Sequence, residues 1–494
     1  MGAIGFFILL GLFTYYFYRW GKRASVSFTD LMITWGIKLL FSFTFIWVFQ
    51  YYYGNGVLYG DAYNFFNDAY LLNQYAYVDP AGYLELLFGL NPEQSIETLP
   101  YVSETQIWSY VDNGDLYNDN RLIIRLNSLI HFISFGNVYV HTLVMSFLSF
   151  LGILMIYRTY ETYFPYKRFA FFVLLLFPSI TFWGSGITKE ALLFFGMGLF
   201  FYGGQQCINR FGWKHLVSLI AGVLVLLLNK PHVSLFLLVF APLLPISRIF
   251  PLSKSLRTAA YFMLPLLFLA FTYTPSSINM LEKISYKQKD MINMGKGGIF
   301  FVTDSSFCAF DYAEKSHFDI DTVTNKIEIH HTTHGEYKLF GESKFNRFKM
   351  TPSQNEYDIY LIQPPSYSYI NTTPIDYNRW NLLRAAPNAL TNTLFRPYPN
   401  DPGSPMKFAA FGSNLLLLIF IVYSIAQRKN LSPEEKTIRL YLTLTALCIL
   451  LLIGWTIPIL GAIVRYKVGA ELLLLLFALI AAKKPYDNNI NRTS

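Results

Sequence analysis

RFGWKHLVSLIAGVLVLLLNKPHVSLFLLVFAPLLPISRIFPLSKSLR, residues 210–257, is the stretch that decides the fold of this chain. It holds two long apolar runs with only Asn229-Lys230-Pro231-His232 between them, and Lys or Arg flanks both outer ends. A helix needs about 20 apolar residues to cross the hydrocarbon core of a bilayer. The stretch therefore predicts two membrane-spanning helices whose basic ends lie on the same side.

The same pattern recurs along the 494 residues, of which 53% are hydrophobic and only 14% charged. A soluble domain averages about 25% charged residues, so most of this surface is expected to face lipid. The sequence predicts an all-α polytopic membrane protein with about eleven transmembrane helices. They are placed near 4–18, 29–52, 134–157, 169–184, 187–206, 215–230, 232–248, 257–274, 407–426, 437–459 and 468–483.

Lys and Arg residues near the predicted helix ends fall on one side, which the positive-inside rule makes the cytoplasm. They are Arg19, Lys22, Arg23, Arg158, Lys167, Arg168, Arg210, Lys214, Arg248, Lys254, Arg257, Arg428, Lys429, Lys436, Arg439, Lys483 and Lys484. The N-terminus is then periplasmic and the C-terminus cytoplasmic. The net charge of +8 reflects topology and contact with anionic lipid, and no nucleic-acid partner is expected. No basic residue precedes the first apolar run, so this helix is predicted to be retained.

Two outward segments hold most of the remaining polar residues and divide the chain. Residues 1–274 form an N-terminal membrane part with the outward loop 53–133, residues 275–406 form a periplasmic insert, and 407–494 form a C-terminal membrane part with a cytoplasmic tail. The insert is long enough for a small α+β or β-containing domain. Alternating polar and apolar residues between Thr322 and Phe340 predict a β-hairpin around His334-Gly335.

Asp61 and Asp68 follow the second predicted helix and are seven residues apart, so on a helix they share one face. A carboxylate at the outer membrane surface is suited to act as a general base that takes a proton from an attacking hydroxyl. The alternative is that these acids only begin an interfacial helix, where negative charge is favourable near the N-terminal end.

Lys189 and Glu190 open a predicted span after the turn Phe177-Pro178-Ser179-Ile180-Thr181-Phe182-Trp183-Gly184-Ser185-Gly186-Ile187-Thr188. Ionisable residues at this depth usually face a bundle interior or a wet cavity. One interpretation has the lysine bind a lipid phosphate or the glutamate orient an acceptor. The other is a simple ion pair at the membrane interface.

Arg465-Tyr466-Lys467 occupies an outward turn, where two cations depart from the positive-inside rule. A phosphate or pyrophosphate headgroup would explain them, because Arg offers a bidentate fork and Lys a point charge. Snorkelling to ordinary headgroups is the alternative. Lys230 and His232 support the same interpretation more weakly. Other outward polar residues are predicted to help hold a diphosphate or to form a solvated rim: Arg121, Arg125, His131 and Arg396.

Metal and disulfide signals are weak. His330-His331-Thr332-Thr333-His334 lacks a local Cys or acidic residue to complete a usual zinc site. Asp112, Asp115 and Asp119 suggest a calcium loop but lack the twelfth-position glutamate of an EF-hand. Cys207, Cys308 and Cys448 are too few and too scattered for a disulfide framework.

These motifs together resemble the GT-C superfamily of polytopic glycosyltransferases, which use polyprenyl-phosphate-linked sugars. Members carry a catalytic acid in the first large outward loop, where this chain has Gly60-Asp61, and many carry an Arg-Tyr-Arg/Lys motif late in the chain, here Arg465-Tyr466-Lys467. The 177–190 turn and Leu394-Phe395-Arg396-Pro397 look like segments of uncharacterised Bacteroidetes-type membrane proteins. The likeness covers 29–274 and 407–483. The chain departs from it in having an extra N-terminal helix and no paired-acid motif, so a divalent cation is left open.

The resemblance implies an inverting glycosyltransferase of the bacterial inner membrane, active on the periplasmic face. Asp61 would be the general base, and Arg465 and Lys467, with Lys189, would hold the phosphate of a polyprenyl-linked donor. The acceptor is a glycan, lipid or protein, and the insert would recognise it or dock another envelope protein. The alternatives are an O-antigen-type polymerase or ligase, and a transporter or non-catalytic subunit of an envelope assembly.

Overall fold

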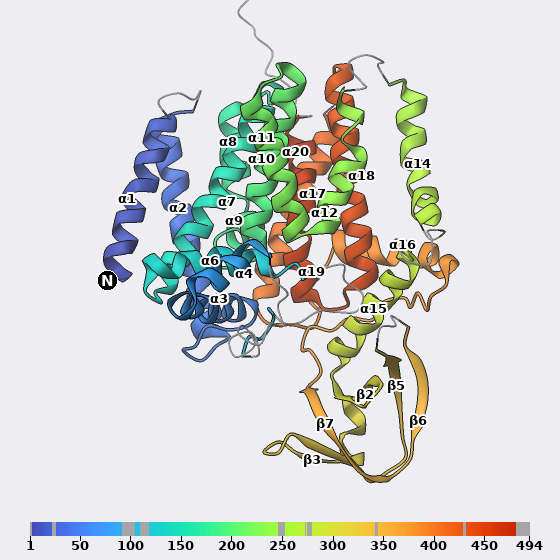
Figure 1. Ribbon diagram of the computed structural model, residues 1–494. Helices are drawn as coiled ribbons and strands as arrows, with labels where there is room; N and C mark the ends of the chain where they lie inside the picture. The colour runs from blue at the N-terminus through green and yellow to red at the C-terminus, as the bar shows by residue number, and fades with distance from the viewer. Residues whose placement is uncertain are drawn as a thin grey trace, which may run out of the picture.

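A computed structural model of the chain describes residues 2–21, 26–90, 104–108, 118–245, 252–271, 273, 279–340, 344–427 and 431–480. It is a helical bundle with a small antiparallel sheet at one end (Figure 1). The bundle helices are α1 (Gly2–Gly21), α2 (Phe28–Trp47), α7 (Val138–Tyr160), α8 (Lys167–Leu176), α9 (Pro178–Trp183), α10 (Lys189–Asn209), α11 (Trp213–Asn229), α12 (Pro231–Phe240), α14 (Lys254–Phe271), α17 (Met406–Ala426), α18 (Pro433–Thr456), α19 (Leu460–Tyr466) and α20 (Val468–Ile480). A π-helical turn, η1 (Val48–Tyr52), extends α2, and a 3-10 turn, η2 (Glu161–Tyr163), follows α7.

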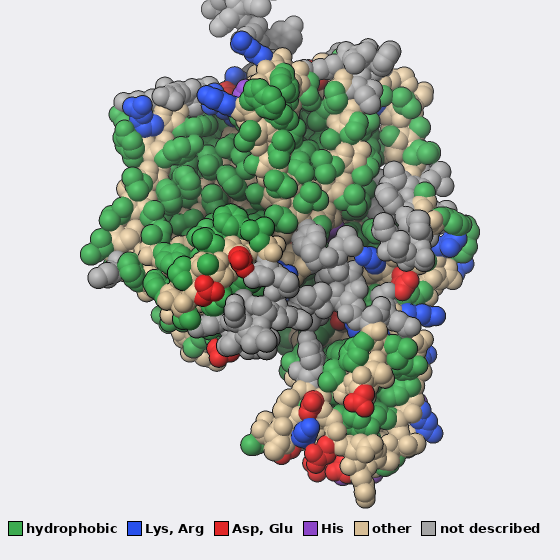
Figure 2. Space-filling model, in the orientation of Figure 1, with side chains coloured by type: hydrophobic (Ala, Val, Ile, Leu, Met, Phe, Trp, Pro, Cys, Tyr) green, Lys and Arg blue, Asp and Glu red, His purple; other side chains and the backbone are tan. Residues whose placement is uncertain are grey.

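The bundle is that of a multi-pass membrane protein. Among the described residues, six helices are long and apolar enough to cross a membrane: Gly2–Trp20, Phe28–Tyr52, Val138–Tyr163, Lys189–Asn209, Met406–Ala426 and Pro433–Thr456. Three shorter apolar helices are Trp213–Asn229, Pro231–Pro245 and Val468–Ile480. Figure 2 shows hydrophobic side chains over the bundle and Lys and Arg side chains at the edge farthest from the sheet. The predicted helical membrane protein is confirmed, whereas eleven crossings stay a prediction.

One predicted span is broken. The sequence predicts a single helix over 169–184, but α8 ends at Leu176 and α9 begins at Pro178. Phe177 between them is extended, with ψ 124°. A proline restricts the residue before it to extended conformations and cannot donate a backbone hydrogen bond, so the helix ends there.

Glycines allow the central helices to approach closely. A Cβ at Gly152 of α7 would lie 2.2 Å from the carbonyl oxygen of Phe194 in α10, and one at Gly222 of α11 would lie 2.4 Å from the backbone nitrogen of Phe200. Small residues at helix contacts are the usual means of packing helices in membranes, where lipid removes most of the hydrophobic driving force. Helix α10 is therefore packed tightly between α7 and α11.

Three helices of the first outward segment lie across the end of the bundle nearest the sheet: α3 (Asp61–Val78), α4 (Pro80–Phe88) and α6 (Arg121–Ser134) (Figure 1). The chain enters α3 through Gly60, whose φ of +67° favours glycine. Asp68 is fully buried and accepts hydrogen bonds from the backbone N–H groups of Gln106, Ile107 and Trp108, at 2.8–3.0 Å. The carboxylate thus fixes segment 104–108 against α3.

The sheet lies between α15 (Met280–Lys296) and α16 (Arg379–Leu394) in the chain, with strand order β3-β4-β7-β1-β2-β5-β6. The strands are β1 (Gly298–Val302), β2 (Ser306–Asp311), β3 (Phe318–Asp321), β4 (Lys326–Ile329), β5 (Thr333–Leu339), β6 (Asn346–Met350) and β7 (Ser353–Gln363), with a 3-10 turn, η4 (Tyr312–His317), before β3. A core that includes Ile299, Phe301 and Phe310 packs on one face.

The predicted hairpin around His334-Gly335 is wrong. Both residues lie inside β5, which pairs with β2 and β6, while β4 pairs with β3 and β7. The hairpin turn lies instead at 322–325, between β3 and β4. Gly335 serves close packing, since a Cβ there would lie 2.6 Å from the Phe310 ring. The sequence signal of a turn glycine was thus produced by a packing glycine.

Backbone hydrogen bonds join the insert to the bundle. Ile370 N–H donates to the carbonyl of Pro458 at 2.8 Å, and Leu460 N–H donates to the carbonyl of Ser368 at 3.0 Å. Gln288 of α15 donates from Nε2 to the carbonyl of Trp455, the penultimate residue but one of contact before the α18 end, at 2.7 Å. The loop between α18 and α19 is therefore held by the insert.

Candidate functional site

Six charged side chains from distant parts of the sequence meet near the end of the bundle that faces the sheet. We call them the charge cluster: Asp61, Asp119, Lys189, Glu190, Lys230 and Arg465. They come from the start of α3, the segment before α6, the start of α10, the α11–α12 junction and α19. Five of the six are residues that the sequence analysis singled out as site candidates.

Arg465 is the centre of the cluster. Its Nη2 lies 2.6 Å from Asp61 Oδ2, and its Nε lies 3.7 Å from Glu190 Oε1. The same Glu190 oxygen accepts from Lys230 Nζ at 2.8 Å. The guanidinium and the Lys230 ammonium both lie beside the Tyr466 ring, 4.8 and 4.7 Å from its centroid. Two cations are therefore held side by side, with Glu190 between them.

Lys189 occupies the flank of the cluster. Its Nζ lies 2.5 Å from Asp119 Oδ1 and 3.3 Å from Asn120 Oδ1. Its carbonyl accepts from Asn229 Nδ2 at 2.7 Å. Together with the Lys230–Glu190 contact, this bond ties the start of α10 to the α11–α12 junction at two points.

Exposure divides the cluster into an inner and an outer part. Glu190 is 1% exposed, whereas the Asp61 side chain is 44% exposed and that of Arg465 is 17% exposed. Arg465 lowers the pKa of the Asp61 carboxyl below its ordinary value, because the guanidinium stabilises the charged form. Asp61 is thus an ionised and accessible carboxylate.

Three buried polar atoms in the cluster have no hydrogen-bond partner in the protein: Glu190 Oε2, Asn229 Oδ1 and Arg465 Nε. Buried polar atoms are nearly always paired with protein or with water. Two acceptors and one donor are therefore left for water or for a ligand that carries both kinds of group. A phosphorylated sugar has both.

Lys467 does not join the cluster, although it lies two residues from Arg465. It is buried and donates to the carbonyls of Thr393 and Arg396, at 3.0 and 3.2 Å, and to Asn414 Oδ1 at 2.7 Å. Its Nζ also lies 3.4 Å from Glu471. Lys467 therefore anchors the α19–α20 junction, and its predicted phosphate contact gains no support from this placement.

Arg396 lies on the segment that Lys467 holds. Its Nη1 pairs with Asp401 at 3.1 Å, and its carbonyl also accepts from Asn414 Nδ2 at 2.6 Å. The Arg396 guanidinium stays half-buried, next to the cluster in the chain's packing but without a contact to it among the interactions of the described residues.

The remaining predicted residues on α3 and α6 have structural roles. Asp68 holds segment 104–108, and Arg121 and Arg125 lie against the Trp108 ring at 5.4 and 5.2 Å while donating to backbone carbonyls. Burial lowers the pKa of His131 to about 4, so the ring is neutral at pH 7 and contacts the Phe66 carbonyl. The structure does not bring these four to the charge cluster.

His232 begins the first turn of α12 just after Lys230, and its electrostatic neighbours are Lys230, Asp119 and Lys189. It is therefore near the cluster. No group of three His, Cys, Asp or Glu side chains within the described residues is arranged to hold a metal ion. Asp112 and Asp115 lie outside the described residues.

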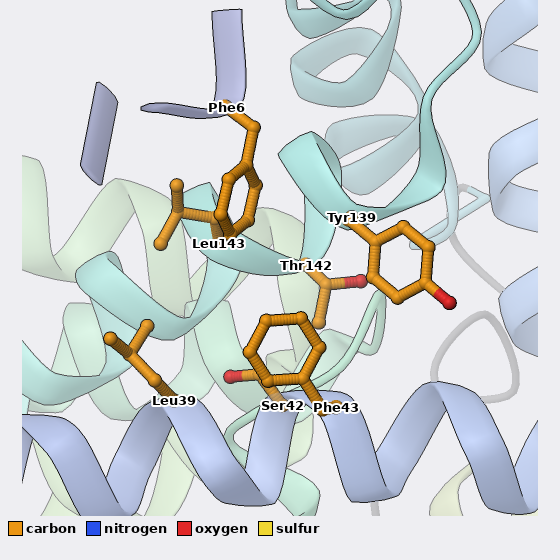
Figure 3. Close-up of a pocket in the computed structure, with 7 residues that line it drawn as sticks. All are labelled: Phe6, Leu39, Ser42, Phe43, Tyr139, Thr142 and Leu143. Carbon is orange, nitrogen blue, oxygen red and sulfur yellow. The ribbon is translucent and has the colours of Figure 1, made fainter. Parts of the chain in front are cut away.

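A small pocket lies elsewhere, between α1, α2 and α7 (Figure 3). It is lined by Phe6, Leu39, Ser42, Phe43, Tyr139, Thr142 and Leu143. No charged side chain lines it, so it offers nothing that would bind a phosphate.

No protein-family model matches the chain, and no curated protein or solved structure matches it. The functional argument therefore depends on the geometry of the charge cluster.

Sequence reasoning missed Lys38, Asn414 and Glu471. Lys38 and Glu471 each lie inside a predicted apolar span, and Glu471 follows Lys467 by four residues, the spacing at which helix side chains meet. An ionisable residue inside a span is itself a signal, which would have identified both.

Proposed function

We propose that the chain is a GT-C-type glycosyltransferase that transfers a sugar from a polyprenyl-phosphate donor to an acceptor hydroxyl. The observation that carries the proposal is the contact between Arg465 and Asp61 at the end of a membrane bundle. An accessible carboxylate beside a guanidinium gives a base and a phosphate ligand within one site.

The donor phosphate would bind Arg465 in place of Asp61. Lys230 lies beside Arg465 around Glu190 and would add a second positive charge to the phosphate site. The carboxylate, released from the guanidinium, would then face the acceptor hydroxyl.

In the reaction, the acceptor oxygen forms a bond to the anomeric carbon while the bond from that carbon to the phosphate oxygen breaks. Asp61 takes the hydroxyl proton, and the polyprenyl phosphate leaves with the electron pair. Direct displacement inverts the anomeric configuration. Arg465 stabilises the negative charge that develops on the leaving phosphate.

The proposal extends to location. Eleven crossings, with the N-terminus and insert in the periplasm and the C-terminus in the cytoplasm, would place the charge cluster at the outer surface of a bacterial inner membrane. The basic edge of the bundle in Figure 2 supports this orientation, because Lys and Arg gather on the cytoplasmic side of membrane proteins.

Asp61→Asn tests the proposal. Asn accepts hydrogen bonds but takes up no proton at working pH, so transfer should fall by about 10²–10⁴-fold. Sugar transfer is measured in membranes that carry each variant at matched abundance, with polyprenyl-phosphate sugars as donors.

Asp79→Asn is the matched control, because Asp79 caps α4 through its side chain and Asn caps a helix equally well. Its transfer should equal that of the wild type. Wild-type transfer by Asp61→Asn would reject the mechanism and favour a polymerase or a non-catalytic subunit.

A further inference from the structure

A lysine lies inside the bundle, away from the charge cluster. Lys38 is in α2, within the candidate span Phe28–Tyr52, and is 1% exposed. Its Nζ donates to Ser149 Oγ of α7 at 2.9 Å and to the carbonyl of Thr181 at 3.2 Å. No carboxylate of the described residues pairs with it. Buried lysines in membrane spans are costly and usually functional, so Lys38 calls for an explanation.

The Thr181 carbonyl belongs to α9, the short helix after the Pro178 break. Glu471 of α20 contacts the same helix from another side, accepting from Ser179 Oγ at 2.5 Å. Glu471 is in turn 3.4 Å from Lys467, the anchor of the α19–α20 junction. Helix α9 is therefore held by one buried ionisable side chain from α2 and one from α20.

The turn after α9 leads to the charge cluster. Ser185 Oγ donates to the carbonyl of Thr181, the same oxygen that Lys38 contacts, at 2.5 Å. Thr188 Oγ1 donates to the carbonyl of Trp183 at 2.8 Å, and the next two residues are Lys189 and Glu190.

The turn has little room to move against α2 and α7. A Cβ at Gly184 would lie 2.5 Å from Ser149 Oγ and 3.0 Å from Lys38 Nζ. A Cβ at Gly186 would lie 2.2 Å from the Phe45 ring of α2. The Lys38 amine thus sits where α9, the turn and α7 meet.

We propose that Lys38 is a positioning residue, which fixes α9 and the 184–188 turn so that Glu190 is presented to Arg465 and Lys230. Its link to catalysis rests on the proposed function, whereas its effect on the turn does not. An apolar side chain would cost less to bury here, so retaining lysine is explained by what its amine holds in place.

The test is Lys38→Met, which keeps an unbranched chain and removes the amine. Amide hydrogen exchange of the peptide that covers 184–190 is measured by mass spectrometry in nanodiscs. Exchange should be about tenfold faster or more, because the turn opens more readily. The melting temperature should not fall, since an unpaired buried amine is gone. Transfer, where it is detected, should fall by up to about 100-fold in kcat, the effect of a misplacement of about 1 Å.

Ser149→Ala is a second variant, which removes one partner of the amine and leaves α9 itself unchanged; it should accelerate the same peptide less. Asp30→Asn is the control, because Asp30 lies on the same helix and pairs with Arg168 instead. Its 184–190 peptide should exchange as in the wild type.

Wild-type exchange at 184–190 in both Lys38→Met and Ser149→Ala would overturn the positioning role. If Lys38→Met does not fold, the Ser149→Ala result decides alone. Faster exchange in a protein that transfers no sugar, in wild type or variant, would support the positioning role and count against the proposed transferase.

Discussion

Two aspartates on one helix show how environment separates residues that the sequence treats alike. Asp61 and Asp68 are seven residues apart on α3, and spacing alone places both on one face. Asp61 is 44% exposed and contacts a guanidinium, whereas Asp68 is fully buried and accepts three backbone N–H groups. Their partners, Arg465 and segment 104–108, lie far along the chain, so no local pattern reveals the difference.

The Asp61–Arg465 pair should make stability depend on pH. The pair lowers the pKa of Asp61 in the folded protein, so its contribution is present above the ordinary Asp pKa of about 3.9 and is lost as the pH falls through the folded value. At pH 7, Asp61→Asn should be less stable by up to about 1 kcal/mol, since the carboxylate is partly exposed. Melting temperatures at pH 7 and near pH 3 measure this, and a gap that persists at the lower pH would contradict it.

Arg465 should dominate donor binding. Arg465→Ala should weaken the binding of a polyprenyl phosphate by about 2 kcal/mol or more, equivalent to about 30-fold in Kd. Arg465→Lys should restore only part of this, because a lysine cannot form the bidentate fork. Binding to folded protein in nanodiscs is the measurement. Equal affinities for wild type and the alanine variant would remove Arg465 from the site.

Elements carry the second level of organisation, and here the sequence was informative about helices and less so about how they end or pair. Pro178 was readable as a helix break, yet the apolar run around it outweighed that signal. Gly335 was read as a turn because a packing glycine and a turn glycine look the same in one sequence. Lys189, Glu190 and Arg465 were identified as site candidates because charges stand out beside apolar runs, whereas the anchoring role of Lys467 depends on Thr393, Arg396 and Asn414, which only the fold brings to it.

Segment 104–108 should depend on Asp68. Asp68→Asn replaces one carboxylate oxygen with an NH₂ group, which cannot accept from a backbone N–H, and so leaves at least one buried donor unpaired. The expected loss is about 1–3 kcal/mol, seen as a lower melting temperature. Protease sensitivity near Gln106 should rise in parallel. A variant as stable as the wild type would show that the segment is held by other contacts.

At the scale of the whole molecule, alternating helix directions bring the charge cluster and the insert to one end. In Figure 1 the labels of α3, α4, α6, α15, α16 and α19 lie toward the sheet, as does the N-terminus of α1. The Lys and Arg distribution predicted this sidedness, because long-range placement in a membrane follows from the order of crossings. The exact partners within the cluster did not follow from it.

Reporter fusions should reveal this sidedness. A fusion after Lys254 should report the cytoplasm, and one inserted in the 322–325 turn between β3 and β4 should report the periplasm. Alkaline phosphatase is active only outside the cytoplasm and a fluorescent protein folds only inside it, which gives two opposite readouts. A cytoplasmic sheet would overturn the proposed location of the site.

The way in which the sheet joins the bundle has a practical consequence for domain exchange. The backbone enters β1 after Gly297 and leaves β7 before Pro364, and a Cβ on Gly297 would lie 2.5 Å from the nitrogen of Pro365. The two ends of the sheet therefore meet, so residues 298–363 can be excised and the cut closed with a short linker. A graft that extended beyond Ser366 would remove the Ser368 and Ile370 hydrogen bonds to the α18–α19 loop. The junction thus defines a replaceable module, whose limits are set by the strand that steadies Arg465.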